Sequence, residues 1–148
     1  MADKIIEKLE IICHDLEGLK QIAEKIISFA GTEKIWLLEG EMGAGKTTMV
    51  KAICDAFEVR DNVHSPTFSL VNEYSNEKEE LFYHFDFYRI KDETEAMDIG
   101  CEEYFYSGNF CFIEWSSKIP SLIPEQYLWI NIEAQENNSR KIHLVRYE

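Results

Sequence analysis

One short segment limits what this chain can fold into more than any other. It reads Gly40-Glu41-Met42-Gly43-Ala44-Gly45-Lys46-Thr47, and a second threonine, Thr48, follows directly. This is the G-x-x-x-x-G-K-T pattern of a phosphate-binding loop. The apolar run 35–39 precedes it, and residues 46–57 carry apolar side chains at helical spacing. Strand, loop and helix in this order favour a nucleotide site over the alternative, a glycine turn before an ordinary helix.

The residue types in this loop fit the chemistry of a triphosphate. Glycines permit positive φ angles and let backbone N–H groups approach the ligand closely. A helix that begins at Lys46 adds unpaired N–H groups and the positive end of its dipole. The Lys46 ammonium would reach the β- and γ-phosphates, and the Thr47 hydroxyl would ligate Mg²⁺. The loop therefore predicts a site for a nucleoside triphosphate with magnesium.

Length and charge narrow the class of protein. A chain of 148 residues with 45% hydrophobic residues predicts one domain, 1–148, with one core. The sequence shows neither an apolar run of membrane-spanning length nor a secretory signal at its start, so we expect a cytoplasmic protein. The formal net charge of −13 argues against unaided nucleic-acid binding. This negative charge suits docking on a basic protein surface, or it contributes only to solubility.

The cysteines and histidines give no metal-binding pattern. No two cysteines have C-x-x-C spacing, and the histidines are scattered, so no zinc site is predicted. We expect the cysteines to be small core residues in a reducing compartment. The cysteines are Cys13, Cys54, Cys101 and Cys111, and the histidines are His14, His64, His84 and His143.

The N-terminal part predicts a strand over 5–13 and then a helix over 16–30. Asp15 is the expected helix cap, and Gly31 is the expected stop. The run 35–39 is then the second strand of the chain.

A hairpin is predicted after the polar loop 60–67. Its strands are 68–74 and 81–89, so the sheet is not purely parallel. Asp86 stands inside the apolar second strand and needs a partner there. The alternatives for that partner are a nearby Mg²⁺, a hydroxyl group, or the side chain of Arg89 or His84 in a structural pair.

The remaining segments complete an α/β fold. Residues 92–106 predict an acidic, solvated helix, and 110–115 predict a short buried strand that ends in Glu114 and a tryptophan. A carboxylate at the carboxyl end of a strand can hold a metal or a water, or can simply face solvent. Strands over 127–133 and 141–147 predict a terminal hairpin. We expect a single P-loop NTPase domain with a mixed parallel and antiparallel sheet flanked by helices.

These motifs resemble those of the TsaE (YjeE) family, P-loop ATPases of the tRNA threonylcarbamoyladenosine pathway. The resemblance covers residues 40–115 in the family's order. Its matching segments are 40–48, Ser65-Pro66-Thr67-Phe68-Ser69-Leu70-Val71, Tyr83-His84-Phe85-Asp86-Phe87-Tyr88-Arg89, 100–105 and Ile113-Glu114-Trp115.

The resemblance implies Mg²⁺-dependent ATP hydrolysis with assigned residue roles. Lys46 would hold the β- and γ-phosphates, and Thr47 would hold the metal. Thr67 would sense the γ-phosphate as a switch residue. Asp86 would take the Walker-B-like position, and Glu114 would lie near Mg²⁺ or the attacking water; either carboxylate would polarise that water.

The nucleoside side and the partners are also implied by the resemblance. Trp115 would lie beside the nucleotide, and the stretch at Cys13 and His14 would approach the adenine. Residues 116–118 depart from the family pattern, so no role follows for them. The implied partners are the TsaB and TsaD proteins, which transfer threonylcarbamoyl to a tRNA adenosine next to the anticodon. This chain would meet tRNA only through that complex, and its ATP use would reset the complex.

Three other classes of protein also contain a phosphate-binding loop of this kind. A small-molecule or nucleotide kinase usually needs several arginines on a lid, whereas the four here are scattered: Arg60, Arg89, Arg140 and Arg146. A GTPase would need an Asn-Lys-x-Asp segment, which the sequence lacks. A module that binds ATP without hydrolysing it would not need Lys46, Thr47, Asp86 and Glu114 together. The sequence therefore favours an ATPase that is slow alone and stimulated by partners.

Overall fold

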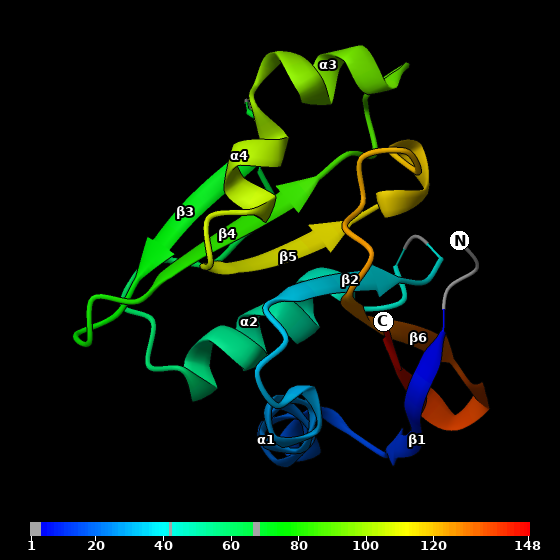
Figure 1. Cartoon of the computed structure of the whole chain (residues 1–148). Coiled ribbons are helices and arrows are strands. Elements are labelled where there is room, and N and C mark those ends of the chain that lie inside the picture. The colour runs from blue at the N-terminus through cyan, green and yellow to red at the C-terminus, as the bar shows by residue number, and fades with distance from the viewer. Residues whose placement is uncertain (1–3, 42, 67–68) are drawn as a thin grey trace.

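A computed structural model describes residues 4–41, 43–66 and 69–148 as one seven-stranded sheet with helices on both faces (Figure 1). The strands are β1 (Ile5–Cys13), β2 (Ile35–Glu39), β3 (Val71–Ser75), β4 (Leu81–Asp86), β5 (Phe110–Glu114), β6 (Tyr127–Ala134) and β7 (Arg140–Tyr147). The helices are α1 (Leu19–Ala30), α2 (Lys46–Ala56), α3 (Glu93–Asp98) and α4 (Cys101–Phe105), with 3₁₀ turns η1 (Leu16–Gly18), η2 (Ser116–Lys118) and η3 (Glu136–Asn138).

The sheet is mixed, as expected. Its strand order is β1-β7-β6-β2-β5-β4-β3. Strands β6, β2, β5 and β4 are parallel neighbours, and the two outer parts of the sheet are antiparallel. The carboxyl ends of β2, β4 and β5 therefore meet at one edge, and Asp86 pairs with Glu114 in the β4–β5 register.

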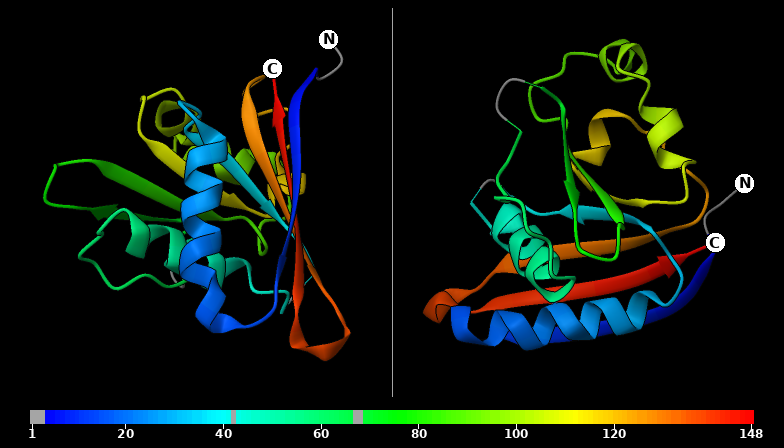
Figure 2. Two further views of the ribbon diagram at one scale, coloured as in Figure 1. Left: turned by 90° about the horizontal axis from the view of Figure 1, so that it is seen from below. Right: turned by 90° about the vertical axis from the view of Figure 1, so that its left-hand side faces the viewer.

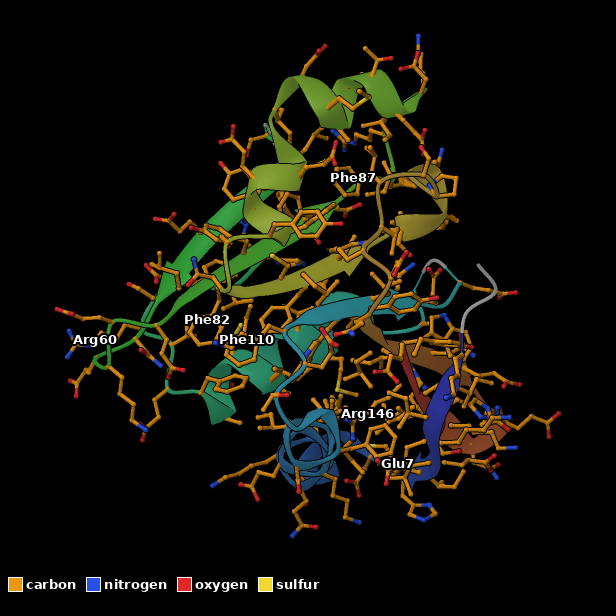
Figure 3. The ribbon with its side chains drawn as sticks, in the orientation of Figure 1. Glu7, Arg60, Phe82, Phe87, Phe110 and Arg146 are labelled. Atoms are coloured by element: carbon orange, nitrogen blue, oxygen red, sulfur yellow. The ribbon has the colours of Figure 1, made fainter. Side chains whose placement is uncertain are left out.

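Helices α1 and α2 cover one face of the sheet (Figure 2). Both helices contribute apolar stripes to a core that also contains Trp36 of β2, which is fully buried. Aromatic rings fill much of this core. Among them, Phe82 and Phe110 stack with their ring centroids 5.2 Å apart. Figure 3 shows these two rings together beside α2. This packing fixes the strand that leads into the phosphate-binding loop.

A second core lies on the opposite face, under α3, α4 and the segment after η2. It includes Phe85 and Phe87, whose rings stack at 5.6 Å. Figure 3 shows Phe87 on the side of the strands toward α3 and α4, away from Phe82. Side chains thus alternate along β4, with Phe82 and His84 on one face and Phe85 on the other.

Several predicted boundaries are wrong, two of them for local reasons. The strand predicted to reach residue 89 ends at Asp86, because its Oδ1 accepts the Tyr88 N–H at 2.9 Å and turns the chain. The helix predicted over 92–106 is two short helices, because Gly100 takes a left-handed conformation, φ 75°, between them. Strand β3 begins at Val71; Phe68, where the strand was predicted to begin, lies outside the described residues.

The N-terminal elements are close to the prediction. β1 has the predicted bounds, with Ile11 and Cys13 buried, but Leu9 on the same side is 42% exposed. Asp15 caps the turn η1, where its Oδ1 accepts the Gly18 N–H at 3.0 Å, and the α-helix begins only at residue 19. Among the described residues, no helix is both long enough and apolar enough to span a membrane.

Candidate nucleotide-binding site

A cavity of about 710 Å³ opens where the carboxyl ends of β4 and β5 meet the start of α2. Its volume is in the range usual for a small-molecule ligand. Its walls include Gly43, Gly45, Lys46, Thr47, Thr48, Ser65, Asp86, Arg89, Glu114 and Trp115. Residues from four of the predicted motifs are thereby brought to one place.

The phosphate-binding loop follows directly from β2, as predicted. Its first glycine, Gly40, has φ 149°, and a Cβ there would lie 2.6 Å from the Ile132 carbonyl oxygen of β6. Gly45 precedes α2 with φ 104°. The loop therefore needs glycine at Gly40 for close approach to a neighbouring strand, and at Gly45 for a left-handed turn into the helix.

Lys46 is held in the loop although it is only 6% exposed. Its Nζ donates to the Gly40 carbonyl at 2.6 Å and lies 3.8 Å from the centre of the Trp115 ring. Burial lowers the pKa of this ammonium, while the charges of Glu114, Glu39 and Asp86 oppose the change. The Lys46 ammonium is therefore poorly hydrated, which favours its contact with an anionic ligand.

Thr47 and Glu114 face each other at the start of α2. The Thr47 Oγ1 donates to Glu114 Oε2 at 3.0 Å and lies 2.8 Å from the Ser65 hydroxyl. Glu114 is 2% exposed, which excludes the alternative of a surface carboxylate at a strand end. Ser65 was not predicted as a site residue, although its loop was part of the family resemblance.

Asp86 lies half-buried at the same edge of the sheet, as predicted. Desolvation raises the pKa of its carboxyl group, as does the Glu114 charge, against the lowering effect of the Tyr88 N–H. His84 hydrogen-bonds to Glu114 rather than to Asp86, so the Asp86–His84 pair considered from the sequence is wrong.

The oxygen groups at this edge suit magnesium. Mg²⁺ prefers hard oxygen ligands and usually binds through one or two carboxylates together with substrate phosphates and water. The Thr47 hydroxyl and the Glu114 carboxylate already converge at 3.0 Å, with Asp86 beside Glu114 in the register. In the described part of the chain, no three His, Cys, Asp or Glu side chains form a metal-binding group by themselves. The residues present thus fit an ion that is shared with a bound triphosphate.

The other predicted residues divide into three groups. Cys13 lines a second cavity of about 290 Å³ that borders Gly43, Gly45 and Thr48, whereas His14 is exposed and not among its described lining residues. Glu41 is exposed and Ala44 is buried within the loop. Met42 and Thr67 lie outside the described residues, so their predicted roles remain predictions.

Two further side chains at the loop were missed. Arg140 Nε donates to the Ala44 carbonyl at 3.0 Å, although Arg140 is 96 residues away in sequence. Ser116 is buried, and its hydroxyl donates to Glu39 at the end of β2. The segment 116–118, to which no role was assigned, therefore contacts the strand that carries the loop.

The fold and the site define a class of protein. A glycine-rich loop between a buried parallel strand and a helix, with a lysine, a threonine and two carboxylates at the carboxyl edge of the sheet, defines a P-loop nucleotide-binding protein.

The comparisons identify the family within that class. A family model described as "Threonylcarbamoyl adenosine biosynthesis protein TsaE" matches residues 13–142. The chain therefore belongs to the TsaE family, as its motifs had suggested.

Relatives and a solved structure agree with this assignment. The tRNA threonylcarbamoyladenosine biosynthesis protein TsaE of Bacillus subtilis is 37% identical over 126 residues, which are 85% of this chain and 78% of that protein. The protein of the same description from Haemophilus influenzae is 36% identical, over 85% of this chain and 79% of that one. The crystal structure of Bacillus subtilis YdiB matches with a TM-score of 0.78 at 28% identity, over 98% of this chain and 88% of that one.

Proposed function

We propose that this chain, acting as one ATPase domain over residues 1–148, binds ATP with Mg²⁺ and hydrolyses it in the service of tRNA threonylcarbamoyladenosine biosynthesis. The observation that carries the proposal is the 3.0 Å contact between the Thr47 hydroxyl and the buried Glu114 carboxylate, beside the phosphate-binding loop. A loop that only bound phosphate would have no need of a buried carboxylate at this place. A metal shared with the phosphates accounts for it.

Each residue has a distinct part in the proposed reaction. Lys46 would exchange its contact with the Gly40 carbonyl for one with the β- and γ-phosphates, and the loop N–H groups would bind the other phosphate oxygens. Thr47, Glu114 and Asp86 would hold Mg²⁺, which neutralises charge on the transferred phosphoryl group. One of the two carboxylates would also orient the attacking water.

The proposed partners are the TsaB and TsaD proteins. The net charge of −13 favours a role in which those partners hold the tRNA and this chain docks on them. Of the four arginines, Arg89 lines the cavity, whereas Arg60 and Arg146 form ion pairs with Glu77 and Glu7. An activating group supplied by a partner is worth about 10³–10⁵ in rate in related chemistry. We therefore expect slow turnover alone and faster turnover in the complex.

The test is phosphate release from ATP by the pure protein, alone and with TsaB–TsaD, with GTP in parallel. Lys46→Ala should reduce the rate by about 100-fold or more. Lys51→Ala is the matched control, because Lys51 lies on the same helix, α2, and is exposed. ATP-specific release that the pair stimulates supports the proposal. Equal rates for wild type and Lys46→Ala would overturn the site, and consumption that requires a small acceptor would indicate a kinase.

A further inference from the structure

A buried histidine stands behind the Glu114 carboxylate, and none of the predicted roles uses it. His84 is fully buried on β4, and its Nε2 lies 2.6 Å from Glu114 Oε2. Its other ring nitrogen, Nδ1, lies 3.1 Å from the Tyr74 hydroxyl on β3. Both ring nitrogens are therefore committed, one toward the cavity and one away from it.

The contacts beyond Tyr74 lead back to the cavity. The Tyr74 hydroxyl lies 2.9 Å from the His64 carbonyl oxygen, and the next residue is Ser65, whose hydroxyl contacts Thr47 at 2.8 Å. Thr47 in turn donates to Glu114 at 3.0 Å. These groups form a closed ring of hydrogen bonds, completed by the backbone between His64 and Ser65. We name it the Thr47–Glu114 ring. Its members are Thr47, Ser65, His64, Tyr74, His84 and Glu114.

The donors in this ring can be assigned from chemistry. An ionised carboxylate only accepts hydrogen bonds, so His84 Nε2 carries the proton in its bond to Glu114. In a neutral imidazole the other ring nitrogen, Nδ1, then carries no proton and accepts a hydrogen bond from the Tyr74 hydroxyl. In that case the Tyr74 oxygen accepts the His64 N–H at 3.3 Å, which keeps Tyr74 bonded to the loop, and the His64 carbonyl keeps Asn72 Nδ2 as its donor at 3.0 Å. Every buried group in the ring thus has a partner.

We infer that His84 is a positioning residue: it holds the Glu114 carboxylate toward Thr47 and ties it, through Tyr74, to the loop that carries Ser65. The inference rests on the proposed function. A glutamate has three rotatable bonds, and burial of its carboxylate without a donor is costly. Without His84, the attraction of the neighbouring Lys46 would draw this carboxylate from its place beside Thr47. Groups that orient metal-binding side chains in this way typically contribute about 10–100-fold to metal affinity or activity.

The measurement is calorimetric binding of a non-hydrolysable ATP analogue over a series of Mg²⁺ concentrations, together with phosphate release. His84→Gln can still place an amide N–H near Glu114, whereas the shorter His84→Asn reaches only as far as Nδ1 does. We expect His84→Asn to lower the Mg²⁺-dependent gain in affinity by about tenfold or more and His84→Gln to restore most of it.

His143→Gln is the matched control, because that histidine lies between Glu10 and Glu133, remote from the cavity lining. Tyr74→Phe keeps the His84–Glu114 bond but removes the link to the loop. Its loss of Mg²⁺-dependent affinity should therefore fall between those of His84→Gln and His84→Asn. Equal behaviour of the Gln and Asn variants, whether both resemble wild type or both lose equally, would overturn the inference. If the wild type itself shows neither Mg²⁺-dependent binding nor phosphate release, the proposed function fails instead.

Discussion

The substitution Gly40→Ala tests how closely the phosphate-binding loop is fitted to the sheet. A Cβ at this position would lie 2.6 Å from the backbone oxygen of Ile132 and 3.2 Å from the Ala44 Cβ, at a φ of 149°. A side chain in such a backbone region costs about 1–3 kcal/mol. Displacing a packed neighbour adds about 1–3 kcal/mol. The expected loss is therefore about 2–6 kcal/mol, a large part of the roughly 5–15 kcal/mol of a typical domain.

Gly31→Ala separates the cost of backbone conformation from the cost of the clash. Gly31 also has a positive φ, 60°, but a Cβ there would meet no atom within 4 Å. Its φ of 60° and ψ of −118° lie outside the left-handed helical region, so Gly31→Ala should lose only the backbone cost, about 1–3 kcal/mol. Urea unfolding followed by circular dichroism gives both values, and a constant m-value would show that the unfolded states are comparable.

Binding of ADP gives the second readout. The Gly40 carbonyl accepts from Lys46 Nζ, so a shift of Gly40 moves the ammonium as well as the loop. Gly40→Ala should weaken ADP binding, whereas Gly31→Ala should leave it unchanged. The reasoning is refuted if Gly40→Ala is no less stable than Gly31→Ala and binds ADP like the wild type.

Three further predictions follow from burial and charge. Burial raises the pKa of the Cys54 and Cys111 thiols to about 12, so iodoacetamide at pH 8 should label them only after unfolding, as mass spectrometry would report. Because the pKa of Asp86 is raised above 3.8, ionisation of its carboxyl group destabilises the fold at neutral pH. Asp86→Asn should therefore unfold at a higher urea concentration than wild type at pH 7, and this difference should shrink as the pH falls toward 3.8. Arg140→Ala removes the donor to the Ala44 carbonyl and should cost about 1 kcal/mol of stability and weaken ADP binding, by urea titration and calorimetry.

The phosphate-binding loop could be predicted because its information is local. The glycines, the lysine and the threonine are adjacent in sequence, and the flanking strand and helix are each decided by their own apolar spacing. The N-terminal strand and the terminal hairpin were predictable for the same reason. The wrong boundaries arose where one residue redirects the chain: a carboxylate bonded to the backbone at Asp86, and a left-handed glycine at Gly100.

The surroundings of Glu114 could not be predicted, because they depend on which strands are neighbours. Alternation along the strand places His84 on the same face as Asp86 and favours a pair between those two side chains. The parallel β4–β5 register instead pairs His84 with Phe112, two residues before the Asp86–Glu114 pair. That offset lets the ring reach Glu114. Arg140 and Ser116 were missed for a similar reason, since their partners at Ala44 and Glu39 are distant in sequence.

The charges around the loop explain why metal and loop would have to act together in the proposed reaction. The Lys46 ammonium is surrounded by Glu39, Asp86 and Glu114, all of which act on its pKa. A triphosphate entering this cavity would meet more nearby carboxylates than ammonium groups, in a region where burial strengthens each charge interaction. A divalent cation at Thr47 and Glu114 would reverse that balance, because it binds the carboxylates and the phosphates at once. The orientation of Glu114 would then decide whether the acidic groups repel the nucleotide or help to hold it, and the hydrogen bond from His84 would set that orientation.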